Sequence, residues 1–256
     1  MVNILKLYTN LDRFYIFKIK YGEIHMDQRI NLKKEQEASL ERPHYKYSLA
    51  ARFFFNMMDI ITGRKITLSK TQLIEILATI PYRAWENRQY EHMTGRYKDQ
   101  SRVVMAKKIA EWGREAQDNE HQHLLVINEK MKEDGEKEAW YMFKPIPFIM
   151  VTVYRIITRM MAVFHIQRAF LFNAEFEDHA EHVYAQFVKE HPEWEEQPVQ
   201  NDVVKDYADL NTWADVFRRI GLDERNHRNN SFVFCGMPDE VVQYDGMPEL
   251  PDVWFE

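Results

Sequence analysis

The sequence predicts an all-α fold for most of the chain. Only eight Gly and nine Pro occur among 256 residues, so long stretches contain few residues that break a helix. From residue 44 onward the apolar side chains recur at helical spacing. Two Glu-x-x-His tetrads lie within these stretches, and residues three apart on a helix share one face.

The elements are expected in the following order. Residues 1–43 form an irregular arm, in which FYIFKIKY is a candidate strand. Helical segments follow at 45–62, 69–95, 99–134, 137–164, 166–190 and 200–230. The polar stretch PEWEEQPVQND connects the last two, and residues 233–256, which contain no Lys or Arg, are expected to be an acidic tail packed on the body. We therefore divide the chain into an arm (1–43), one domain (44–232) and a tail (233–256).

Composition narrows the possible functions. A net charge of −6 and a pI near 6.0 argue against a nucleic-acid partner, because binding to phosphate backbones requires an excess of Lys and Arg. The single Cys235 excludes an intrachain disulfide and favours a reducing compartment. The N-terminus mixes acids and bases into its apolar residues, unlike a secretory signal or a transit peptide. A bacterial or organelle-encoded product is therefore expected.

Residues 146–164 are the most apolar stretch, but Arg155 and Arg159 interrupt it, so no run reaches the roughly 18 apolar residues of a spanning helix. Two interpretations fit. The helix lies in a membrane interface with both arginines reaching the headgroup layer, or it is buried and its arginines reach internal carboxylates. The segment at 45–62 is similarly apolar and contains Arg52.

The two tetrads, Glu120 to His123 and Glu224 to His227, suggest a pair of metal ions. Di-iron carboxylate bundles combine two helices that each bear Glu-x-x-His with two helices that each supply one further Glu. A third tetrad, ending at His44, contains Pro43 and is interpreted as a turn where the chain enters the domain.

Glu75 is the first candidate for a further acid. It is the only charged residue across positions 71–82, and its helical neighbours supply no cation. A buried acid needs a compensating partner, and a metal ion is one.

The other acid lies in AEFEDHAEHVY, where Glu175, Glu177, Asp178 and Glu181 compete. Glu177 shares a helix face with Tyr184, which places an acid beside a redox-capable phenol. We interpret His179 and His182 in the same stretch as supporting or surface residues rather than ligands.

Four stretches of the chain resemble, in the same order, the motifs of the alternative oxidases, and in particular those of the plastid terminal oxidase branch and its bacterial relatives. These stretches are LIEILATIPY, NEHQHL, FEDHAEHVY and LDERNHR. The resemblance covers residues 45–232. It assigns as metal ligands Glu75, Glu120, His123, Glu177, Glu224 and His227.

The resemblance implies a ferritin-like four-helix di-iron bundle with two interfacial membrane-binding helices. It implies two iron ions as cofactor, and oxidation of a membrane quinol, plastoquinol or ubiquinol, by dioxygen to give water without proton pumping. It also implies a homodimer attached to one leaflet, either the cytoplasmic face of a bacterial inner membrane or a thylakoid.

Several further residues have expected roles beside the metal ligands. Asn119 and Asp223 precede the two tetrad acids and are expected to orient the histidines, while Tyr184 is expected to carry a radical or to hydrogen-bond near the metals, unless it is a packed core tyrosine. Arg52 and Asp59 are candidates for the entrance of the quinol pocket. Two departures from the family pattern lie in the same region, since Val183 replaces a usual Thr and Lys70 a usual Arg.

Two other functions compete with a quinol oxidase. One is a membrane-associated di-iron hydroxylase of quinone biosynthesis, which would release an oxygenated product. The other is ferritin-like iron storage, which would require a soluble shell of many subunits.

Overall fold

The structure is a computed structural model that describes residues 30–252. Within that range the chain forms eight α-helices and no sheet, which confirms the all-α prediction for this part of the chain. The helices are α2 (Leu32–Glu41), α3 (Leu49–Thr62), α4 (Leu68–Gly95), α5 (Gln100–Asp134), α6 (Ile146–Phe164), α7 (Ile166–Glu190), α8 (Asp202–Tyr207) and α9 (Trp213–Phe234). The candidate strand FYIFKIKY lies outside the described residues.

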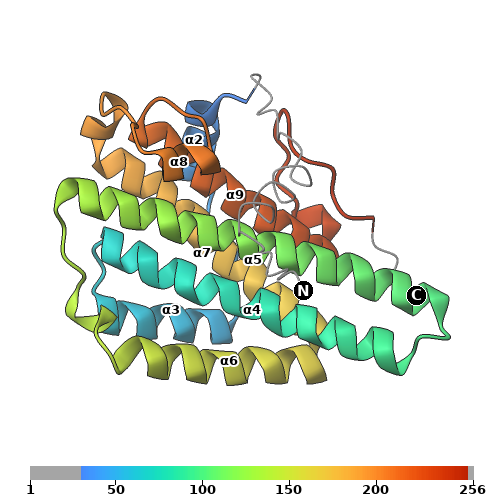
Figure 1. Ribbon diagram of the computed structural model, residues 1–256. Coiled ribbons are helices and arrows are strands. Elements are labelled where there is room, and N and C mark those ends of the chain that lie inside the picture. Colours follow the sequence, from blue (N-terminus) through green and yellow to red (C-terminus); the bar gives the residue numbers. More distant parts are fainter. Residues whose placement is uncertain (1–29, 253–256) are drawn as a thin grey trace, which may run out of the picture.

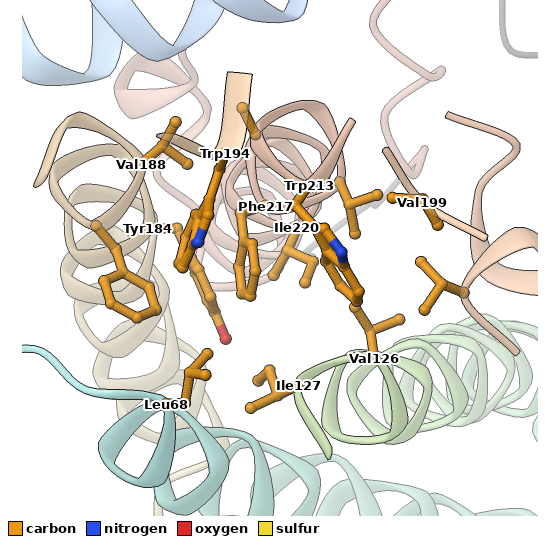
Figure 2. Packing of buried hydrophobic residues seen from close by; sticks show 14 of the residues in the cluster. Leu68, Val126, Ile127, Tyr184, Val188, Trp194, Val199, Trp213, Phe217 and Ile220 are labelled. Atoms are coloured by element: carbon orange, nitrogen blue, oxygen red, sulfur yellow. The ribbon is translucent and has the colours of Figure 1, made fainter. Parts of the chain in front are cut away.

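Four long helices form the centre of the molecule. Helix α4 packs along α5, and α7 packs along α9, with α4 also in contact with α7 (Figure 1). Figure 2 shows one of the shared cores, where Leu68 of α4 and Ile127 of α5 lie opposite Tyr184 of α7 and Phe217 of α9. All four side chains are almost completely buried. Apolar faces of all four helices therefore meet in one interior.

A glycine brings two of these helices close together. A Cβ added at Gly221 of α9 would lie 3.2 Å from the Cβ of Tyr184 on α7. This is tighter than ordinary van der Waals contact, so the missing side chain permits the close approach. The approach matters because α7 and α9 both carry candidate metal ligands.

Several helix boundaries differ from the sequence prediction. The segment predicted as one helix at 200–230 is two helices, because the chain is extended after Tyr207 and the Thr212 side chain accepts a hydrogen bond from the backbone N–H of Asp215 to start α9. The segment predicted at 137–164 begins its α-helix only at Ile146, after a 3₁₀ turn at Trp140–Met142 and Pro145. Ser48 caps α3 in the same way as Thr212 caps α9.

Helix α2 corrects the expectation of an irregular arm up to residue 43. Its charged side chains hold it to the body: Arg225 of α9 binds the Glu35 carboxylate and donates a 2.8 Å hydrogen bond to the Glu35 carbonyl oxygen. Arg42, just after the helix, binds Glu181 of α7. Ion pairs rather than an apolar stripe dock this helix, so hydrophobic periodicity did not reveal it.

Helices α3 and α6 lie side by side on the outside of α4 (Figure 1), with the Phe54 ring 5.1 Å from that of Tyr154. Both leave large apolar side chains exposed, among them Phe53 at 68% and Phe148 at 69%. The full exposed set on these two helices is Leu49, Phe53, Met57, Ile60, Phe148, Ile149, Val153, Ile156, Ile157, Met160, Val163 and Phe164.

Helix α6 is also the one helix among residues 30–252 that is long and apolar enough to cross a membrane. Its arginines do not reach internal carboxylates. Arg155 is exposed, and Arg159 donates a 2.9 Å hydrogen bond to Glu91, which is itself exposed. The buried-helix interpretation is therefore wrong, and the exposed apolar surface suggests membrane association.

Candidate metal centre

Six acidic and imidazole side chains from four helices meet in the interior. Glu75 comes from α4, Glu120 and His123 from α5, Glu177 from α7, and Glu224 and His227 from α9. All are buried, with exposed fractions between 0% and 6%. An unpaired carboxylate is very costly to bury, so the cluster requires compensating positive charge.

The six residues form two overlapping groups, each able to hold a metal ion. One group is Glu75, Glu120, His123 and Glu224, and the other is Glu120, Glu177, Glu224 and His227. In each group the candidate ligand atoms lie within 4.8 Å of one another. The two groups share two acids, one from each tetrad.

The shared acids each present one oxygen to each histidine. Glu120 places Oε2 3.4 Å from the Nδ1 of His123 and Oε1 2.7 Å from the Nδ1 of His227. Glu224 places Oε1 3.1 Å from His123 and Oε2 3.7 Å from His227. This is the arrangement expected of carboxylates that bridge two cations. Glu75 completes the first group, with Oε2 3.3 Å from the Nδ1 of His123.

These atoms lack alternative partners. Both oxygens of Glu120 and of Glu224, Oε2 of Glu177 and Nδ1 of His227 are buried without a hydrogen bond, although some lie close enough for an ion pair. Buried polar atoms are nearly always satisfied, so a group of orphans indicates a missing ligand. Four carboxylates and two neutral imidazoles carry four negative charges, which two divalent cations would balance. The residues therefore fit a two-metal centre.

The electrostatics of the cluster support the same conclusion. Burial, with the Glu224 carboxylate, raises the pKa of Glu75 well above its usual value, and burial with Glu120 does the same at Glu177. At Glu120 burial also disfavours the charge, but His227 and His123 outweigh it and hold the pKa low. Burial would lower the pKa of His227, yet the Glu120 carboxylate raises it to about 10.

Asp223 orients one of the histidines. Its Oδ2 lies 3.4 Å from the Nε2 of His123 and accepts a 2.6 Å hydrogen bond from the hydroxyl of Tyr207. Arg219 binds the other carboxylate oxygen. With Nε2 held in this way, Nδ1 of His123 faces the acids. Asn119, expected to act likewise, is half-buried, and its side chain makes no hydrogen bond to either histidine or to any other residue in the described range.

Two tyrosines hold the acids that are not shared. The hydroxyl of Tyr184 donates to Glu75, and that of Tyr82 donates to Oε1 of Glu177 at 2.7 Å. Asn173 also donates to Glu177, at 3.0 Å, and to Ser231 on α9 at 3.1 Å. Sequence reasoning missed Tyr82 and Asn173, although Tyr82 lies seven residues after Glu75 and Asn173 four before Glu177, both on the ligand face.

Arg52 and Asp59 are not brought together. Arg52 is exposed and has no ion pair among residues 30–252, whereas Asp59 accepts a 2.7 Å hydrogen bond from the Nζ of Lys70. Lys70 is 3% exposed and also donates to the carbonyl of Gly63 at 2.8 Å. Val183 packs in the apolar core between α3, α4 and α7.

Asp178, His179 and His182 of α7 have partners outside the metal cluster. Asp178 accepts from Arg228 at 2.8 Å and from the hydroxyl of Tyr47 at 2.9 Å, so its charge is already satisfied. Both ring nitrogens of His182 face backbone carbonyls, at 2.6 Å and 3.0 Å. The His179 ring stacks on Phe55 at 4.2 Å, and burial lowers its pKa to about 4. His44, Asp178 and His182 could also surround a cation. However, the hydrogen bonds just described already satisfy Asp178 and His182.

Comparison with protein-family models and with curated protein sequences identified no relative of this chain. The geometry of the buried cluster therefore carries the functional argument.

Proposed function

We propose that this chain is a di-iron quinol oxidase of the alternative oxidase type, similar to the plastid terminal oxidase branch. In this proposal α4, α5, α7 and α9 form a ferritin-like bundle around two iron ions, and α3 and α6 lie in the membrane interface. The reaction converts two quinols and one dioxygen into two quinones and two water molecules, without proton pumping.

One observation carries the proposal. Two groups of four potential ligands share Glu120 and Glu224, and the oxygens of these shared acids have no hydrogen bond. This ligand set is that of the carboxylate di-iron bundles, with one Glu from each of two helices and Glu-x-x-His from each of two others. Iron bound there would supply the electron-transfer chemistry that reduces dioxygen. Carboxylate-rich sites with imidazole suit it.

The surrounding residues prepare the site. Asp223 fixes the ring of His123 in the orientation that turns Nδ1 toward the acids. The hydroxyl of Tyr184 donates a hydrogen bond to Glu75. A phenol beside a metal ligand can donate a proton to a reacting group or accept one from it. The almost completely buried side chains of Leu73 and Ile127 help to keep bulk water out of the interior.

The substrate reaches the site from the membrane. A quinol is an apolar molecule dissolved in the bilayer, and the exposed apolar faces of α3 and α6 suit attachment to one leaflet. We place the enzyme on the cytoplasmic face of a bacterial inner membrane or on a thylakoid, as a homodimer that uses plastoquinol or ubiquinol.

An oxygen electrode and elemental analysis test the proposal. Purified protein in detergent should hold about two irons per chain and consume oxygen when it receives ubiquinol or plastoquinol. Glu120→Ala should lose both properties, because Glu120 belongs to both ligand groups. Glu111→Ala is the matched control, since Glu111 lies on the same helix but is exposed and pairs with Lys107.

Several results would contradict the proposal. Full quinol-dependent oxygen uptake by metal-free protein would end it. An oxygenated quinone precursor as the product would indicate a hydroxylase instead, and a soluble shell that accumulates iron would indicate storage.

A further inference from the structure

A cavity of about 190 Å³ lies between α4 and α6, apart from the metal cluster. Its apolar wall includes Ile80 and Ala84 of α4 and Val151 of α6. Its polar lining residues include Arg83, Arg155 and Arg159.

The cavity carries excess positive charge in a chain whose net charge is −6. Arg155 makes no ion pair among residues 30–252, and Arg83 uses its Nε on the neutral Gln117 at 3.2 Å. Of the three arginines only Arg159 has an acidic partner, the exposed Glu91. Three arginines therefore line the cavity, and only one of them has a carboxylate partner. This excess of positive charge makes the cavity complementary to an anion.

The cavity also adjoins the exposed apolar face of α6. Residues four apart on a helix are separated by about 400°, or only about 40° more than a full turn. Val151, Arg155 and Arg159 therefore lie along one stripe of α6. That stripe borders the sector occupied by Ile156, Met160 and the other exposed apolar residues of the helix. When this sector enters a bilayer, the stripe at its edge lies at the depth of the headgroups.

We propose that this cavity binds the phosphate headgroup of an anionic phospholipid. The arginines contact the phosphate oxygens, and the apolar wall receives the upper part of an acyl chain. The inference rests on the interfacial position of α6 in the proposed function, but it requires neither the metals nor the oxidase reaction.

Vesicle flotation tests the proposal with the full chain. The probes are vesicles of phosphatidylcholine alone and vesicles that also contain phosphatidylglycerol. Phosphatidylglycerol should increase the bound fraction of the wild type, and Arg155→Gln should reduce that increase about five-fold, with a further reduction in the Arg83→Gln/Arg155→Gln double variant. Binding to phosphatidylcholine alone should not change. Arg102→Gln on α5, where Arg102 is exposed and pairs with Asp99, should behave as the wild type.

The two vesicle types separate the possible failures. Absence of binding to phosphatidylcholine would contradict the interfacial position of α6, and oxygen uptake in detergent would still test the oxidase. An equal loss for Arg155→Gln and Arg102→Gln would mean general charge attraction and would overturn the cavity as a site.

A thermal shift assay provides an independent measurement and shows whether the variants fold. Short-chain phosphatidylglycerol should raise the melting temperature of the wild type but not that of Arg155→Gln. Glycerol phosphate and inorganic phosphate should have a smaller effect. If free phosphate stabilises the protein while anionic vesicles bind no better than neutral ones, the lipid is the wrong ligand. If Arg155→Gln changes only the oligomeric state, the cavity is a contact between copies and the proposal is wrong.

Discussion

The Nε2 of His123 lies 3.4 Å from Oδ2 of Asp223, the residue that immediately precedes the shared ligand Glu224. This contact links the second tetrad to the histidine of the first, so the residue beside the second tetrad helps to position the first. The carboxylate is fixed in turn by Tyr207 and Arg219.

Asp223→Asn should therefore weaken metal binding about 10- to 100-fold while the fold is retained. An amide can donate to Nε2, which would disfavour the tautomer that leaves Nδ1 free to bind a metal. Titration with Mn(II), followed by elemental analysis, measures the change. Glu111→Gln on α5, where Glu111 is exposed and pairs with Lys107, is the comparison and should bind metal as the wild type does. Equal affinity in Asp223→Asn would remove the orienting role.

Tyr184→Phe and Tyr82→Phe form a matched pair, because each removes one hydroxyl that holds an unshared acid. If Tyr184 moves a proton as well as holding Glu75, its loss should lower kcat at least about 100-fold with iron retained. Tyr82→Phe should lower kcat less, since only the orientation of Glu177 changes. Steady-state oxygen uptake and iron content of both variants measure this difference. Equal effects would restrict Tyr184 to positioning.

Removal of metal should destabilise the protein. The centre buries four carboxylates, and the oxygens of the two shared acids have no hydrogen bond within the chain. Chelation should lower the Tm, and re-addition of Fe(II) without air, or of Mn(II), should restore it in proportion to occupancy. Glu120→Ala should show no metal-dependent change in Tm, whereas Glu111→Ala should respond fully. A Tm that is independent of metal in the wild type would contradict a structural contribution from the centre.

Glu181 should control acid stability through the docking of α2. Burial opposes its charge, but Arg225 and Arg42 outweigh burial and lower its pKa from 4.5 to about 2. Because the folded pKa is depressed, the unfolded chain binds more protons in this range, and stability is lost as the pH falls from 4.5 towards 2. Glu181→Gln should lose about 3 kcal/mol of unfolding free energy at neutral pH, since Arg225 keeps a buried charge.

Denaturant unfolding at several pH values tests this prediction. The variant should lose less additional stability than the wild type below pH 4.5, because the titrating group is gone. Glu190→Gln is the control on the same helix, where Glu190 is exposed and should have little effect. Parallel curves for wild type and Glu181→Gln would show that Glu181 is not the titrating group.

Sequence periodicity predicted the elements that local spacing determines. Six helical segments were expected, and long helices occur at each, although the region around Ala208 is extended and splits the last one. Each tetrad places its Glu and its His on one face of its own helix, and this does not depend on the angle at which the helices cross. When these two helix faces are buried against the faces that carry Glu75 and Glu177, the six side chains form the two groups of potential ligands.

The sequence alone determined the all-α class, the ligand-bearing faces and the apolar character of the 146–164 segment, because all of these depend on residues within a few turns of one another. Only the tertiary structure decided that α2 docks through Glu35 and Arg42, and that Tyr82 supports Glu177. It also decided that the Asn119 side chain makes no hydrogen bond to a histidine and that α6 exposes its arginines. Each of these depends on the rotation and register of one helix against another. Side chains distant in the sequence set that register together, so no local pattern specifies it.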